Sequence, residues 1–435
     1  MRIPTLVRLS AIHVSVALTL LPINSTLNRI MITELGISAT LVALLVSVPY
    51  LLSPMQLWIG SLGEQRPIWG YHRSPYIIIG LVLCAFGAAS SPTAAFAIYD
   101  GLWWGIPFGF VAFGAWGFGF NFATVSYLAL ATELSSPTER SKTVGVMWFV
   151  LILSMIIGGI SFSRAIEPYT HERLITAFIE MAGLALGIGL LGVIGLEQRG
   201  PAAVPAEQRP SMQVVLRTVW GNPQAKRFFV YLILLLVGLL GQDVLLEPYA
   251  GDIFGVPPAV TTRYTSIWGT TLLVGLLITS PLTKRYGMKR IAGSGAVIAA
   301  LGLGLIVAAG AVHEVGLLVP GLVVFGFGSG ISTAANLALM LDMTVAGQVG
   351  VFIGAWGVAD ALARFGGTML SGILRDVIGY AMGSVYAGYA VVFGIEIALF
   401  GVSLLLLKNI EVSAFTRHAT TRDVIAAAGE RTSSS

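Results

Sequence analysis

Long apolar stretches dominate this chain of 435 residues. A helix needs about 20 apolar residues to cross a hydrocarbon core of about 30 Å. Only 11% of the residues are charged and the mean hydropathy is +0.85, which excludes an ordinary soluble protein. We therefore predict an all-α membrane protein with twelve transmembrane helices, near residues 9–33, 38–62, 75–98, 102–131, 143–164, 172–195, 228–250, 259–282, 290–311, 315–341, 350–373 and 384–408.

The basic residues predict one orientation. The chain has 25 lysines and arginines, and most lie in the tails or in loops that connect an even-numbered span to the next. Cytoplasmic loops are enriched in these residues, so both termini are expected to face the cytoplasm. The net charge of +4 is then a topology signal, and no basic arm or stacking platform indicates nucleic acid. The basic residues outside this pattern are Arg29, Arg164, Arg173, Arg263, Arg364 and Arg375.

A polar segment divides the expected spans six and six. It is rich in Pro, Gln and Arg at first and becomes amphipathic over residues 212–220, a pattern typical of helices that lie along a membrane surface. The predicted organisation is an N-terminal half (1–196), a cytoplasmic linker (197–227), a C-terminal half (228–409) and a polar cytoplasmic tail (410–435).

The two halves resemble each other in sequence. A shift of 209 residues places residues 117–119, Gly-Phe-Gly, on residues 326–328, and it places Glu133 on Asp342. A shift of 219 residues sets Asn24 and Asn28 against Asp243 and Glu247. Parallel repeats of six spans are typical of transporters in which two halves rock about a site near the midplane.

Two short loops on the predicted cytoplasmic side, within residues 60–73 and 133–140, carry glycines, acids and arginines in a pattern that resembles signatures of the major facilitator superfamily. In that superfamily, glycine turns with acidic and basic partners hold neighbouring helices together. The alternative is that these basic loops only fix the topology. The first loop contributes Gly60, Glu64, Arg66, Gly70 and Arg73, and the loop after the fourth span contributes Glu133 and Arg140.

Residues 27–35, 66–77 and 242–249 resemble a narrower group, the PucC/LhaA proteins, which form the bacteriochlorophyll-delivery branch of the same superfamily. The third segment is the most specific, because Asp243 and Glu247 lie four residues apart and are followed by Pro248 inside an apolar helix. The resemblance covers nearly the whole chain except the linker and the tail.

This resemblance implies a major facilitator fold and a function. The function is that of an inner-membrane assembly factor which delivers bacteriochlorophyll to, or inserts it into, the light-harvesting complexes of a phototrophic bacterium. Bacteriochlorophyll is the implied cargo, and a carotenoid is a further candidate. The implied partners are light-harvesting antenna polypeptides, pigment-synthesis enzymes and membrane lipid. No catalytic or direct metal-binding motif is present, so an enzyme is not expected. The alternative function is a proton-coupled secondary transporter of a small solute.

Charged residues inside the expected spans define the candidate sites. An ionised side chain at this depth costs about 3 kcal/mol or more, so each is expected to face protein or a wet cavity and to be paired. Asp360 and Arg364 are four residues apart and are expected to pair within the eleventh span. The full set is Arg29, Glu180, Asp243, Glu247, Asp360, Arg364 and Glu396.

The first and seventh spans supply the predicted central polar site. Arg29 is expected to neutralise Asp243 or Glu247 across the two halves. Such a site would either handle cargo or serve as a polar lock between the halves. Pro22 and Pro248 are expected to kink these spans. The predicted members are Asn24, Asn28, Arg29, Gln242, Asp243 and Glu247.

A bound bacteriochlorophyll would need an apolar slot and one axial ligand for its magnesium, either an imidazole nitrogen or an oxygen. His13 is the histidine within an expected span, and Asn121 and Asn336 are the alternatives. A hydrogen bond to a neighbouring residue is the competing interpretation for the histidine.

Overall fold

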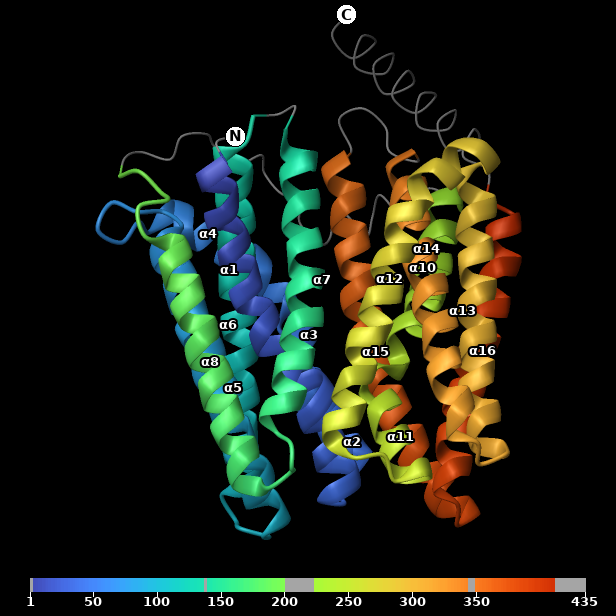
Figure 1. Ribbon diagram of the computed structural model, residues 1–435. Helices are drawn as coiled ribbons and strands as arrows, with labels where there is room; N and C mark the ends of the chain where they lie inside the picture. Colours follow the sequence, from blue (N-terminus) through green and yellow to red (C-terminus); the bar gives the residue numbers. More distant parts are fainter. Residues whose placement is uncertain (1–2, 137–138, 200–222, 343–348, 411–435) are drawn as a thin grey trace, which may run out of the picture.

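In a computed structural model, residues 3–136, 139–199, 223–342 and 349–410 are described. These residues form helices and no β-strand, arranged as two bundles that lie side by side (Figure 1). The predicted amphipathic part of the linker and the predicted polar tail lie outside the described residues.

The N-terminal bundle contains eight α-helices among the described residues. The first expected span runs from α1 through two π-helical segments, Pro22–Leu27 and Ile30–Glu34, and the second is divided among α2, α3 and α4. The helices are α1 (Ile3–Leu21), α2 (Ala39–Val46), α3 (Val48–Leu51), α4 (Gln56–Gln65), α5 (Ser74–Tyr99), α6 (Gly105–Leu134), α7 (Arg140–Ala165) and α8 (His171–Val193).

The C-terminal bundle is built in a similar way. Its first span is divided into α10 and α11 by a 3₁₀ segment, Gly241–Val244. The helices are α10 (Pro223–Leu240), α11 (Leu246–Phe254), α12 (Pro258–Tyr286), α13 (Met288–Ala311), α14 (Leu318–Asp342), α15 (Val349–Met382) and α16 (Val385–Lys408).

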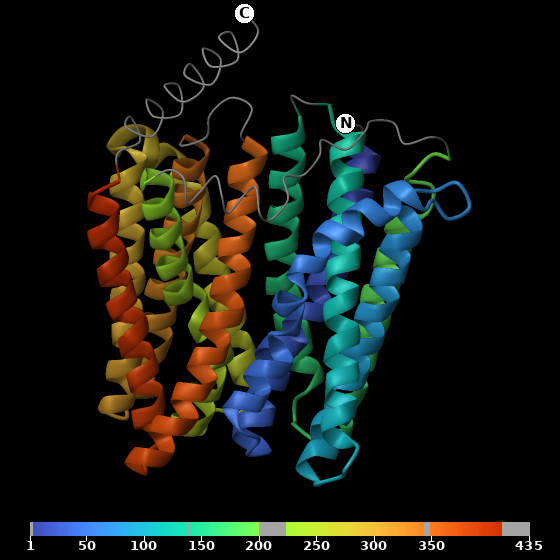
Figure 2. The same cartoon turned by 180° about the vertical axis from the view of Figure 1, so that it is seen from behind.

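Ten helical stretches of the described chain are long and apolar enough to cross a membrane. They match every expected span except the second, which is broken into short helices, and the eleventh, which corresponds to α15. The count of twelve spans therefore stays a prediction. The start of α1 and the end of α16 lie at the same end of the molecule, as Figures 1 and 2 show.

The two prolines expected to kink the central spans act differently. The first span changes from α-helix to π-helix at Pro22, where the ring removes one backbone donor. Pro248 lies in the first turn of α11, where a missing N–H leaves no helical bond unmade. The seventh span breaks in the turn directly before this proline, at Gly241–Val244, so the expected kink at Pro248 stays a prediction.

Glycines bring equivalent helix pairs close together in both halves. A Cβ added to Gly119 of α6 would lie 2.4 Å from the backbone nitrogen of Cys84 in α5. A Cβ added to Gly328 of α14 would lie 2.3 Å from that of Ala299 in α13. These glycines therefore pack helices against each other, as small residues do in membrane bundles.

Candidate functional site at the interface between the halves

The two halves meet through polar contacts from broken helices. Thr26, in the π-helical part of the first span, shares a 2.7 Å hydroxyl contact with Thr262 of α12. Ser163 of α7 donates to the carbonyl oxygen of Ala259 at 2.6 Å. Breaks in regular helices leave backbone groups free for such contacts, and in transporters they commonly line the central site.

Asp376 of α15 caps a helix of the other half. Its carboxylate accepts from the backbone N–H of Ala39 at 3.2 Å and of Thr40 at 2.8 Å, and from the Thr40 hydroxyl at 2.8 Å. The first N–H groups of a helix have no partner within the helix, so this carboxylate completes the start of α2.

Arg29 crosses the interface but pairs within its own half. Its side chain is 2% exposed, and Nη1 lies 2.6 Å from Oε1 of Glu34. Nη2 donates to the carbonyl oxygen of Val256 in the C-terminal half at 2.6 Å, passing over Gly251. The expected ion pair with Asp243 or Glu247 was therefore wrong. In a π-helix the next turn is reached at i+5 rather than i+4, which places Glu34 beside Arg29.

The partner of Asp243 comes from α15. Nη1 of Arg364 lies 3.8 Å from Oδ2 of Asp243, and its Nε donates to Oδ2 of Asp360 at 3.0 Å, which is the pair expected within the eleventh span. Its guanidinium also lies 5.4 Å from the ring centre of Tyr50 in α3. One arginine thus links the break in the seventh span to the N-terminal half, a connection that the sequence analysis missed.

Glu247 occupies a hydroxyl-rich part of the interface. Its side chain is 5% exposed, and Thr265 of α12 donates to its Oε1. Its other oxygen, Oε2, has no hydrogen-bond partner among the described residues. A buried carboxylate oxygen without a donor is open to a ligand that donates a hydrogen bond.

The three predicted amides take different positions. Asn28 donates from Nδ2 to the carbonyl oxygen of Val244 at 3.4 Å, across the halves. Gln242 is fully buried and donates to Asp243 at 2.8 Å. The side-chain oxygens of Asn24, Asn28 and Gln242 are buried without a donor in the described part of the chain. Within the described residues the interface therefore presents several unpartnered acceptors and one unpartnered donor, Nε of Arg29.

Of the three candidate pigment ligands, the two asparagines have their side chains engaged. Asn121 donates to the carbonyl oxygens of Pro49 and Gly117 at 3.0 and 2.8 Å and accepts from Gln56 at 2.8 Å. Asn336 accepts from the Tyr231 hydroxyl at 2.6 Å and donates within α14. Asn121 thus holds the broken second span against α6, and Asn336 links α14 to α10, so a packing role accounts for both.

His13 differs from these amides. It is 2% exposed, and its Nδ1 has no hydrogen-bond partner within the described residues. Its ring centre lies 5.1 Å from that of Tyr127 and 5.5 Å from that of Trp148, whose side chain is half exposed. Among the three candidates, His13 is therefore the one with an unused ligand atom.

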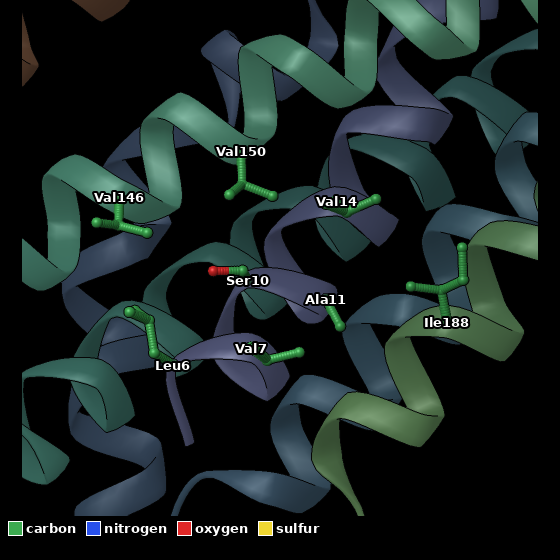
Figure 3. A pocket seen from close by; sticks show the side chains of 8 residues that line it. All are labelled: Leu6, Val7, Ser10, Ala11, Val14, Val146, Val150 and Ile188. Atoms are coloured by element: carbon green, nitrogen blue, oxygen red, sulfur yellow. The ribbon is translucent and has the colours of Figure 1, made fainter. Parts of the chain in front are cut away.

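An apolar groove runs along α1, and His13 is not among the residues that line it. It has a volume of about 380 Å³ and is open to the outside of the bundle (Figure 3). Ser10 is the one polar side chain in its lining. Such a groove fits a hydrocarbon chain better than a polar solute. The lining residues are Leu6, Val7, Ser10, Ala11 and Val14 of α1, Val146 and Val150 of α7, and Ile188 of α8.

The first of the loops that resemble the superfamily signatures connects α4, α5 and α6 at the opposite end of the molecule from Asp376. Arg73 pairs with Glu133, with Nη2 2.8 Å from Oε1, and donates to the carbonyl oxygen of Gly60 at 3.2 Å. Glu197, which the sequence analysis missed, accepts from the backbone N–H of Arg73 at 3.0 Å and of Ser74 at 2.6 Å, capping α5.

The other predicted loop residues contribute less. Gly70 adopts a φ of 80°, which favours glycine, and the carbonyl oxygen of Arg66 accepts from the Tyr76 hydroxyl at 2.6 Å. The side chains of Glu64 and Arg140 lie outside what the structure describes.

Comparison with solved structures defines the class of fold. The nucleoside transporter NupG superposes with a TM-score of 0.73 at 13% identity, covering 92% of this chain and 99% of that one. A D-xylose-proton symporter superposes with a TM-score of 0.70 at 15% identity, covering 93% and 96%. The chain therefore has the fold of the major facilitator transporters.

Sequence comparison defines the family. A family model described as PUCC protein matches residues 26–415, and the chain belongs to that family. The protein PucC of Cereibacter sphaeroides is 30% identical over 429 residues, 94% of this chain and 92% of that protein. The bacteriochlorophyll synthase 44.5 kDa chain of Rhodobacter capsulatus is 28% identical over 421 residues, 93% and 94% of the two chains.

Proposed function

We propose that this protein is an assembly factor that delivers bacteriochlorophyll to, or inserts it into, light-harvesting antenna complexes. The observation that carries the proposal is the full-length similarity to PucC proteins, including a relative named as a bacteriochlorophyll synthase chain. Antenna polypeptides and pigment-synthesis enzymes are the proposed partners, in the inner membrane of a phototrophic bacterium with both chain termini in the cytoplasm. No catalytic step is assigned to it.

The apolar groove and His13 support a hypothesis for how such a cargo would bind. The apolar groove along α1 would take the hydrocarbon tail, and a carotenoid or a lipid chain would fit the same surface. His13 would supply the axial nitrogen to magnesium. The half-exposed Trp148 ring lies edge-on to His13 with ring centres 5.5 Å apart, so it would have to rotate to expose the imidazole to a pigment.

Two measurements test this proposal. Deletion of the gene in a host without a paralogue is expected to lower assembled antenna absorbance while free bacteriochlorophyll is still made. Unchanged antenna absorbance would contradict the proposal.

The second measurement is the absorption spectrum of the gently purified protein. Pigment is expected to copurify with it, and His13→Phe is expected to remove most of that absorbance. His171→Phe is the matched control, because His171 stacks on Phe96 at the far end of the bundle with ring centres 4.2 Å apart. Equal pigment in both variants would exclude His13 as the ligand.

A proton-coupled transporter of a small solute is the second candidate. Its support is the buried acids Glu247 and Glu396, each with one oxygen lacking a donor in the described residues, in a fold shared with a proton symporter. Vesicles containing the protein would then move solute with a proton gradient, and no uptake would count against this candidate.

A further inference from the structure

One face of α8 points away from the protein. On its other side the helix packs against α1 and α5, and it lies at the edge of the N-terminal bundle in Figures 1 and 2. The outward face is a single stripe of exposed residues at helical spacing, and we name it the α8 face. Its members are Thr176, Glu180, Gly183, Leu184, Gly187 and Leu191.

Glu180 is the unexpected member of the α8 face. The sequence analysis expected this acid to face protein or a wet cavity, but its side chain is exposed on the outside of a helix long and apolar enough to cross the membrane. It lies nine residues after His171, about 14 Å along the helix axis from its start. No hydrogen bond or ion pair to Glu180 occurs within the described chain. A carboxylate at that depth requires a partner, because hydrocarbon supplies none.

Two glycines beside Glu180 leave room for close approach. A Cβ added to Gly183 or Gly187 would meet no atom within 4 Å. The inward glycines of the same helix behave differently, since a Cβ at Gly189 would lie 2.6 Å from Ser15 Oγ and one at Gly192 2.8 Å from the Arg8 carbonyl oxygen. The outward pair therefore packs against no other part of the described chain. Its spacing, Gly-x-x-x-Gly, is the one at which membrane helices approach each other.

A second copy of this chain is a poor occupant for the α8 face. Copies that share one membrane orientation would pair through a two-fold axis along the membrane normal. That symmetry sets Glu180 of one copy beside Glu180 of the other at equal depth, where two carboxylates repel. Lipid chains would cover the glycines but would offer no donor to the acid.

We propose that the α8 face docks a transmembrane helix of another polypeptide, and that this helix donates a hydrogen bond or carries a cation at the depth of Glu180. The charge of Glu180 selects such a helix, and Gly183 and Gly187 let its backbone come close. The inference rests on the proposed function only in assigning the partner to the antenna polypeptides.

Site-directed photo-crosslinking in native membranes tests the docking surface. A benzoylphenylalanine placed at Leu184, which is 55% exposed, is expected to crosslink to a membrane-spanning segment of one polypeptide, identified by mass spectrometry. The matched control is the same probe at Leu405 of α16, which is 60% exposed and has no acid on its outward side. Crosslinks only to lipid, or only to a second copy, would overturn the proposal.

Two substitutions then separate docking from folding. Gly187→Leu and Glu180→Leu are each expected to lower the crosslink yield from Leu184 about tenfold, because the first blocks the close approach of the docked helix and the second removes the acceptor for its donor. Gly401→Leu on the outward side of α16 is the control for added bulk, since Gly401 also has open space at its Cβ. Folded protein should be unchanged in all three, and an unchanged crosslink yield in both α8 variants would overturn the proposal.

The outcomes also separate this inference from the proposed function. A crosslinked membrane helix that belongs to no antenna polypeptide would support the docking surface while contradicting the partner assigned under the proposed function. Normal antenna absorbance in the deletion strain would contradict the proposed function and leave the crosslink result standing.

Discussion

The last helices of the two halves, α8 and α16, resemble each other except in the direction of one acid. They span 23 and 24 residues, and each starts at a hydroxyl cap, Thr170 or Ser384. Glu396 of α16 is 2% exposed and accepts from Ser371 at 3.3 Å, whereas Glu180 of α8 is exposed on the outside. Equivalent helices thus carry an internal acid in one half and an external acid in the other, which indicates that the two halves have different tasks.

The largest expected difference comes from reversing the charge of each acid. Glu396→Lys places an amine among α10, α15 and α16, and we expect a loss of stability of about 3 kcal/mol or more. Glu180→Lys exchanges one outward charge for another on a longer stem that reaches toward the headgroups, so the fold should change little. Fluorescence-detected size-exclusion chromatography after heating measures both. Equal losses would mean that the acids have the same surroundings.

Glycines on inward and outward faces provide the next test. Gly388→Ala in α16 would bring its Cβ 2.5 Å from the carbonyl oxygen of Arg375, and Gly192→Ala in α8 has a similar backbone clash. Each is expected to cost about 1–3 kcal/mol in thermal unfolding. The outward substitutions Gly187→Ala and Gly401→Ala should be neutral or stabilising, because alanine favours helix. Destabilisation by an outward substitution would contradict the open space assigned to that face.

A smaller effect is expected from the hydroxyl that supports Glu396. Ser371→Ala removes the donor to Oε1 and leaves this buried oxygen unsatisfied, at a cost of about 1 kcal/mol. The control is Thr176→Ala on the α8 face, where the exposed hydroxyl lies one turn from Glu180 and no loss is expected. Midpoints of thermal unfolding in detergent compare the two. If only Thr176→Ala lowered the unfolding midpoint, the stabilising hydroxyl would be the one near Glu180 and not the one near Glu396, which would contradict the prediction.

The smallest effects should be equal in the two helices. Thr170 accepts from the Arg173 N–H at 3.1 Å and Ser384 from the Ala387 N–H at 3.2 Å. Alanine at either cap is expected to cost about 0.5–1 kcal/mol. The same unfolding measurement applies, and clearly unequal losses would weaken the claim that α8 and α16 are equivalent.

The sequence predicted features that depend on composition or on one regular helix. Apolar length located ten of the twelve expected spans, and the i,i+4 spacing correctly placed Asp360 beside Arg364. Prediction from the sequence failed where the backbone departs from regular α-helix. The partner of Arg29 is Glu34 because the first span becomes π-helical, and no residue pattern specified that change.

Contacts between distant segments were also out of reach. The sequence analysis named Asp243 and Arg364 but treated them as separate features, because nothing in a single sequence sets the rotation of α15 against the break in the seventh span. The direction of Glu180 was missed for a related reason. The cost of a charge in hydrocarbon predicts that the acid is covered, but it does not say whether this chain or another provides the cover.

Asp376 makes separation of the halves at its end a cooperative event. One carboxylate of α15 satisfies three donors at the start of α2, two backbone N–H groups and one hydroxyl. Moving α15 away would release all three together, and the first turn of α2 would lose its cap in the same step. A partial opening saves none of these bonds, so this end is expected to switch between two discrete positions rather than to widen gradually.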